Sequence, residues 1–275
     1  DSGTATDLPE TMLDNFIQLN KPQERLFTGQ IDSNKWFDVR YRSWEATARL
    51  SHSELHGLTG ARTSLIPHQL YIAHEVARRF APRVLLADEV GLGKTIEAGL
   101  VLQELLLRQR VEFVLVSCPA SVCLQWRDEM FKRFGLQFEV MNRAFIDKRR
   151  RERGFGVNPW TTHNRFIISH DLLRRPEYRE ALLNTLGEKA KRSLLILDEA
   201  HVAAPASAGK YATDSNITKV IRDVAPRFEN RLFLSATPHN GHSNSFASLL
   251  ELLDPQRFTR GVAVTDAKQR DAVMV

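Results

Sequence analysis

The sequence predicts an α/β fold in which a parallel sheet carries helices on both faces. Three observations support it: five short apolar runs, longer helical patterns between them, and a glycine-rich turn directly after the first run. Short continuous apolar runs are typical of parallel strands that are buried on both faces. Strands that alternate with helices are joined by right-handed crossovers, so their carboxyl ends meet at one edge of the sheet. We therefore expect functional residues at that edge.

The expected elements follow in chain order. Apolar residues with helical spacing cover 41–55, and Pro67 suits the first turn of a second helix. The expected strands are 84–87, 113–117, 166–168, 194–197 and 232–234, with helices at 95–107, 122–134 and 246–253. Residues 202–209 are mostly small and are expected to form a loop, whereas segment 21–40 gives no clear pattern.

Composition excludes several classes of protein. The chain of 275 residues has no apolar run of the roughly 18 residues that a membrane span needs, and its start lacks a secretion signal. Its two cysteines, Cys118 and Cys123, cannot form a disulfide framework, so we expect buried thiols in the reducing cytoplasm. A net charge of +5 permits nucleic-acid partners. The chain begins without an initiator Met, and we expect it to be a piece of a longer protein.

A phosphate-binding loop is predicted directly after the first strand. Gly91 and Gly93 let backbone amides approach phosphate oxygens, and the helix that follows adds the positive end of its dipole. Lys94 supplies a charge to the phosphates of ATP, and the Thr95 hydroxyl is a Mg²⁺ ligand. Asp88 stands where the general pattern has its first glycine. The alternative is a glycine-rich turn with an incidental lysine, which the flanking strand and helix disfavour.

Two adjacent carboxylates follow the strand at 194–197. Asp198 is expected to hold Mg²⁺, and Glu199 to orient and deprotonate the attacking water. Two acids after a strand are commonly a solvated cap, but the phosphate loop upstream favours the catalytic interpretation.

A third segment, 234–238, lies at the end of the last strand. The hydroxyl groups of Ser235 and Thr237 are expected to bond with His201 and to couple nucleotide state to the rest of the molecule. A simple turn closed by Pro238 is an equally open alternative.

The densest basic segment is 143–153. Arg149, Arg150 and Arg151 are candidates for contacts with nucleic-acid phosphates, but charge runs are more often solvated faces of a helix or loop. Trp126 is expected in the core rather than stacked on a base.

Together, the segments Asp88–Thr95, Asp198–His201 and Ser235–Pro238 resemble the first RecA-like lobe of the Snf2 branch of superfamily 2 helicases. That branch typically has Asp at the position of Asp88. The resemblance places helicase motifs Q, I, Ia, Ib, II and III in a lobe at 61–275, after an N-terminal extension at 1–60 that we expect to be mainly helical. It implies adenine or nucleotide binding by Gln69, Arg62 and Leu92. It implies nucleic-acid contacts for Ser121, Gln125 and His170.

Different segments of the chain resemble two different bacterial groups within the Snf2 branch. Segments 21–30 and 60–69 resemble the RapA (HepA) family of bacterial ATPases that associate with RNA polymerase, whereas 158–163 and 235–258 resemble DISARM-type bacterial Snf2 helicases. The resemblance implies an ATP-driven translocase on double-stranded DNA, an RNA–DNA hybrid or RNA. The resemblance to RapA further implies that RNA polymerase is the partner and that the translocase recycles it. The alternatives are an anti-phage helicase and a nucleotide-gated protein-binding module.

The second RecA-like lobe of such motors, with its arginine finger, is not found before Val275. We expect it elsewhere in the longer protein. The present chain should then bind ATP with Mg²⁺ but hydrolyse it weakly by itself.

Overall fold

The structure is a computed structural model that describes residues 27, 29, 33–52, 60–64, 66–87, 93–204, 215–237, 243–259, 262 and 273–274. It divides into two compact units, residues 1–53 and 54–275, and each is described by itself. In the first unit, helix α3 spans Asn34–His52. The expected helix is confirmed for its described part, but it begins within the segment that gave no clear pattern. No helix of the described residues is long and apolar enough to cross a membrane.

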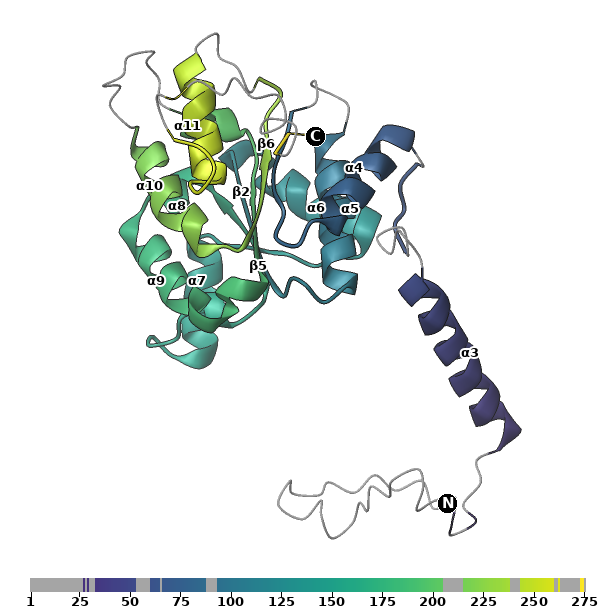
Figure 1. Ribbon diagram of the computed structural model, residues 1–275. Coiled ribbons are helices and arrows are strands. Elements are labelled where there is room, and N and C mark those ends of the chain that lie inside the picture. The colour runs from purple at the N-terminus through teal and green to yellow at the C-terminus, as the bar shows by residue number, and fades with distance from the viewer. Residues whose placement is uncertain are drawn as a thin grey trace. The chain divides into compact units, whose positions relative to one another are not determined.

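The second unit is built on a parallel sheet (Figure 1). Its strands are β1 (Arg83–Leu86), β2 (Phe113–Cys118), β3 (Glu139–Val140), β4 (Arg165–Ser169), β5 (Ser193–Leu197) and β6 (Asn230–Leu234). Their order across the sheet is β1-β6-β5-β2-β4-β3, and every described pair is parallel. The expected fold and all five expected strands are confirmed. Strand β3 is additional, because two residues are too few to leave a pattern in the sequence.

Helices cover both faces of the sheet (Figure 1). One face carries α4 (Pro67–Arg78), α5 (Lys94–Leu107) and α6 (Cys123–Phe134). The other carries α7 (Arg143–Arg153), α8 (His170–Leu173), α9 (Pro176–Leu186), α10 (Asn216–Val224) and α11 (Ser243–Leu253). Because side chains alternate along a strand, β2 serves both cores: Phe113 and Leu115 pack on one face, and Val114 and Val116 on the other.

Local signals fix several helix ends. Pro67 is the first residue of α4, as expected. The side chain of Asn142 caps α7 by accepting a hydrogen bond from the amide of Phe145 at 2.8 Å, so the basic segment is a helix rather than a loop. A short 3₁₀ helix, Ala200–Ala203, covers the first two residues of the expected loop, whereas 205–209 lie outside the described residues.

Helices α5 and α6 approach closely at Gly99, where a Cβ atom would overlap the ring of Phe134. Only glycine permits this contact, which fixes α5 against α6. At the other end of α6, Cys118 and Cys123 are buried free thiols whose Sγ atoms share a hydrogen bond at 3.4 Å. The expectation of buried thiols is thus confirmed.

Candidate functional site

Three neighbouring strands, β1, β6 and β5, lead the predicted site segments to one edge of the sheet (Figure 1). Because these strands are parallel, their carboxyl ends lie at the same edge. Backbone hydrogen bonds continue past the strand ends: the amide of Ser235 donates to Leu86 O at 3.1 Å, and that of Asp198 to Ser117 O at 2.9 Å. The hydroxyl segment is therefore held beside the end of β1, and the carboxylate segment beside the end of β2.

The end of the predicted phosphate loop forms the start of α5. Gly93 precedes the helix with φ +88°, a left-handed conformation that glycine adopts with little strain. Lys94 and Thr95 are the first two residues of α5 and are half-buried. Amide groups of a first helical turn have no partner within the helix, and the dipole makes this end positive. The other loop residues predicted here, Asp88, Gly91 and Leu92, lie outside the described residues.

Gln69 lies directly against this loop. It belongs to the first turn of α4, only 3% of it is exposed, and its Nε2 atom is 2.7 Å from the point that a Cβ on Gly93 would occupy. The structure thus brings Gln69 and Gly93 together. Arg62 is exposed, and its backbone amide donates to Arg133 O at 2.7 Å. No contact among the described residues joins its side chain to Gln69.

Asp198 is held at the end of β5 by two donors on its carboxylate. The indole Nε1 of Trp126 donates to Oδ2 at 2.8 Å, and the amide of Glu199 donates to Oδ1 at 2.9 Å. A third contact reaches the backbone: His170 Nε2 lies 3.0 Å from Asp198 O. A carbonyl oxygen only accepts, so this ring nitrogen carries the proton and Nδ1 accepts from Ser117 Oγ at 2.8 Å.

Glu199, His201 and Ser235 form a chain of side chains. His201 Nδ1 lies 3.2 Å from Glu199 Oε2 and 3.4 Å from Ser235 Oγ, and Ser235 Oγ accepts from the amide of Thr237 at 3.2 Å. Glu199 has φ +47°, a left-handed conformation that is strained for a residue with a side chain. The structure thus brings together the two segments that contain the residues predicted for coupling, 198–201 and 235–238.

The residues predicted to contact nucleic acid are split between surface and interior. Ser121 and Gln125 are exposed, at the turn before α6 and on that helix. His170 is 8% exposed, with both ring nitrogens engaged inside the lobe, and burial lowers the pKa of its imidazole. Direct contact between His170 and nucleic acid does not fit this placement. A pattern of residue types does not reveal which way a side chain points.

Two of the three predicted basic contacts on α7 are engaged within their own helix. Arg149 pairs with Glu152 at 2.8 Å, and its guanidinium lies 5.1 Å from the centre of the Phe145 ring. Arg151 Nε donates to the backbone oxygen of Asp147 at 3.3 Å.

The third, Arg150, lines a groove of about 470 Å³ between α7 and α9. Arg143 and Arg175 line it as well, with Asp147 and Glu177 as its acidic members. Within the described residues, Arg143 and Arg150 form no ion pair. Arg143 and Arg150 are therefore the arginines of α7 that carry an unpaired charge into this groove.

A comparison with known protein families shows to which family the chain belongs. The SNF2-related domain family matches residues 30–269. The chain belongs to that family. A second family, the RapA N-terminal Tudor-like domain, matches residues 1–29. The resemblance of the sequence to Snf2 ATPases and to RapA is confirmed.

Solved structures show the same fold. The SWI2/SNF2 ATPase core of Sulfolobus solfataricus in complex with double-stranded DNA aligns with a TM-score of 0.55 and 21% identity, over 72% of this chain and 37% of that one. A second structure, the SWI2/SNF2 ATPase core domain of Sulfolobus solfataricus, aligns with a TM-score of 0.53 and 21% identity, over 72% of this chain and 36% of that one. The SNF2-related domain thus spans little more than a third of the length of these structures.

The site of this SNF2-related domain fits a cation that is bound partly by substrate phosphates. It fits less well a cation that is bound by protein side chains alone. Among the described residues, no cluster of three or more His, Cys, Asp and Glu side chains is placed to hold a metal ion. Mg²⁺ usually takes only one or two protein ligands and fills its shell with water and substrate phosphates. Asp198 and Thr95 offer oxygen ligands of this kind.

Trp126 and Ser117 are site residues that the sequence analysis missed. Trp126 is 2% exposed, as expected of a core residue, and Ser117 is buried within β2. The only signal was indirect, because a buried indole N–H requires an acceptor and the sequence does not say which one.

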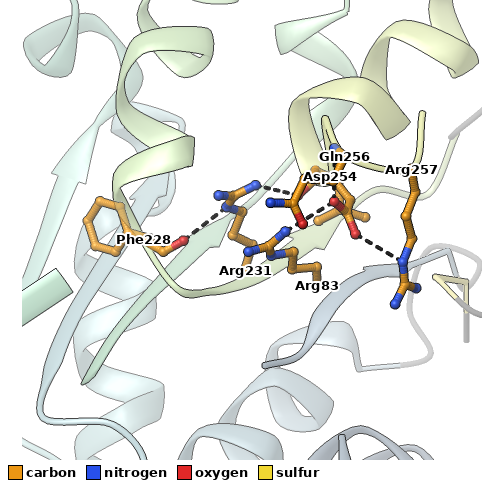
Figure 2. A network of polar contacts seen from close by, with 7 residues as sticks. Arg83, Phe228, Arg231, Asp254, Gln256 and Arg257 are labelled. Atoms are coloured by element: carbon orange, nitrogen blue, oxygen red, sulfur yellow. Dashed lines mark hydrogen bonds and ion pairs between the residues drawn. The ribbon is translucent and has the colours of Figure 1, made fainter. Parts of the chain in front are cut away.

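A separate polar network lies at the opposite edge of the sheet of the SNF2-related domain (Figure 2). Asp254, which follows α11, pairs with Arg83 at 3.1 Å and with Arg257 at 3.4 Å. Arg231 is 2% exposed and donates to Leu253 O at 2.7 Å. Burial, together with the charge of Arg83, lowers its pKa to about 10. These contacts anchor the end of α11 to the starts of β1 and β6, far from the functional edge.

Proposed function

We propose that this chain binds ATP with Mg²⁺ at the carboxyl edge of its sheet, as the nucleotide-binding lobe, residues 61–275, of an ATP-dependent translocase on double-stranded nucleic acid. One observation carries the proposal: His201 joins Glu199 to Ser235, and the amide of Ser235 bonds to Leu86 O at the end of β1, the strand that precedes the phosphate loop. Membership of the SNF2-related family supports an ATP hydrolase.

In this proposal the start of α5 receives the phosphates. Lys94 supplies positive charge, and the absent side chain of Gly93 leaves room for a phosphate oxygen at the helix end. Gln69, packed against Gly93, recognises adenine together with Arg62. The contact between Gln69 and Gly93 supports a nucleotide site to which both α4 and the start of α5 contribute.

Asp198 and Thr95 hold Mg²⁺, and Glu199 orients the attacking water and accepts its proton. Bound Mg²⁺ neutralises charge on the phosphates. His201, which contacts both Glu199 and Ser235, connects the carboxylate to the end of β6. Ser235 and Thr237 are proposed to carry nucleotide state onward from there.

The test uses Lys94→Ala in the 275-residue chain, with Lys132→Ala on α6 as control. The measured quantity is the Kd of a fluorescent ATP analogue with Mg²⁺. We expect Lys94→Ala to weaken binding at least about 10-fold, because a charge-assisted contact to phosphate is removed. The control should bind as the parent chain does. Equal affinity of all three proteins would show that nucleotide does not bind at this edge.

Double-stranded DNA is the proposed substrate. The structural relative with a TM-score of 0.55 was solved in complex with double-stranded DNA, and the exposed Ser121 and Gln125 offer uncharged contacts to a backbone. The variant Lys94→Ala also distinguishes a motor from a nucleotide-gated binding module. Loss of partner remodelling with retained partner binding supports the motor, whereas full retention of function supports the module.

A second candidate function is docking on RNA polymerase through residues 1–53. The match of residues 1–29 to the RapA Tudor-like domain favours it. Helix α3 adds exposed aromatic side chains at Trp36, Phe37, Tyr41 and Trp44. A chain shortened to 54–275 should lose binding to immobilised RNA polymerase but keep ATP binding. Undiminished polymerase binding by the shortened chain would rule this surface out.

A further inference from the structure

The carboxylate of Asp198 is oriented by a residue that is distant in the sequence. Trp126 lies on α6, 72 residues before Asp198 in the sequence, and its indole donates to Oδ2. The amide of Glu199 donates to the other oxygen, Oδ1. Because each oxygen carries one bond, the plane of the carboxylate is fixed about its Cβ–Cγ axis.

This orientation leaves the carboxylate able to accept further bonds. A carboxylate has about four lone-pair positions, and two are used by Trp126 and Glu199. The remaining positions are available to a hydrated cation. If the indole N–H were lost, only the Glu199 amide would hold the Asp198 carboxylate. The carboxylate would then be free to rotate away from the orientation in which it faces the cation.

We propose that Trp126 is a positioning residue for Mg²⁺: its N–H group holds Asp198 in the orientation that the cation requires. The proposal rests on the proposed function, in which Asp198 is a Mg²⁺ ligand. Groups that orient a metal ligand without touching the metal typically contribute about 10- to 100-fold in metal affinity or activity.

The position of Trp126 on α6 gives this bond a further consequence. The inner side of α6 carries Trp126, whereas Gln125, its neighbour in sequence, is exposed. Helix α6 also meets α5 at the contact between Phe134 and Gly99. A shift of α6 caused by contact at Gln125 would therefore move the donor to Asp198.

The experiment compares Trp126→Phe with Trp160→Phe in the 275-residue chain. Trp160 is a matched control because it is 1% exposed and its Nε1 donates at 3.0 Å to Tyr178 O, a bond that does not involve the site. For each protein the Kd of a fluorescent ATP analogue is measured in Mg²⁺ and in EDTA. The ratio of the two values reports the contribution of Mg²⁺ without any need for turnover.

We expect Trp126→Phe to reduce this ratio about 10-fold while the Kd in EDTA stays unchanged. Trp160→Phe should leave the ratio as in the parent chain. An unchanged ratio in a folded Trp126→Phe protein, or an equal fall in both variants, would overturn the inference. The proposed function fails in a different way, namely when Lys94→Ala leaves the affinity for nucleotide unchanged.

Discussion

The Nε2 atom of Gln69 occupies the space beside Gly93 that any other residue would need for its Cβ atom, at 2.7 Å from that point. Gln69 comes from α4 and Gly93 from the start of α5, so the contact joins two segments that were predicted to bind different parts of ATP. The proposed nucleotide recognition and the packing of α4 against the start of α5 therefore depend on the same glycine.

Gly93→Ala tests this contact. The added methyl group must displace Gln69, and alanine is strained at φ +88°, so we expect a loss of about 1–2 kcal/mol in unfolding free energy and at least about 10-fold weaker ATP binding. Urea unfolding and the Kd of a fluorescent ATP analogue measure the two effects. Gly135→Ala is the control, because Gly135 has φ +66° but nothing lies within 4 Å of its added Cβ. The Gly135→Ala variant should lose stability but keep the ATP affinity of the parent chain. A loss of ATP affinity comparable to that of Gly93→Ala would contradict the prediction.

Ser235 should contribute to stability as well as to coupling. It is fully buried, and its Oγ accepts from the amide of Thr237, so Ser235→Ala should lower the unfolding free energy by about 1 kcal/mol. Thr237→Ala removes an exposed side chain and should change it by less than about 0.5 kcal/mol. Urea titrations of both variants check this. Equal effects would mean that the turn at residues 235–237 does not depend on the Ser235 hydroxyl.

The groove between α7 and α9 predicts which arginines contact DNA. Replacing Arg143 and Arg150 together by Ala should weaken duplex binding and reduce the slope of log Kd against log salt by about 2, because two phosphate contacts are lost. Fluorescence anisotropy with a DNA duplex at several salt concentrations measures the slope. Arg227→Ala, an exposed arginine ahead of β6, should leave it unchanged. A double variant with the parent slope would show that this groove does not contact DNA.

The network at the opposite edge of the sheet should dominate stability there. The side chain of Asp254 is 5% exposed, and Asp254→Asn would remove the charge that pairs with the half-buried Arg83 and offsets the nearby buried Arg231, at about 3–5 kcal/mol. Asp171→Asn breaks a surface pair with Arg174, in which the aspartate is 67% exposed, and should cost about 1 kcal/mol or less. Urea unfolding compares the two. ATP affinity should be unchanged in both, since neither residue contacts the functional edge.

The sequence by itself determined the elements and the chemistry of the nucleotide edge. The five apolar runs became strands because burial on both faces leaves a continuous local pattern, and Pro67 marked the start of α4 because its missing amide suits that position alone. The segments that contain Lys94, Asp198 and Ser235 were predicted at strand ends, and parallel strands can only bring such ends to one edge.

Only the tertiary structure decided which side chains meet. The bond from Trp126 to Asp198 spans 72 residues, the imidazole of His170 turns inward, and Arg149 pairs within α7 while Arg150 faces a groove. These choices depend on the strand order β1-β6-β5-β2 and on the direction of each side chain. Neither is contained in a local pattern, because a hydrogen bond between distant residues forms only after the packing of the whole sheet has placed its donor and acceptor.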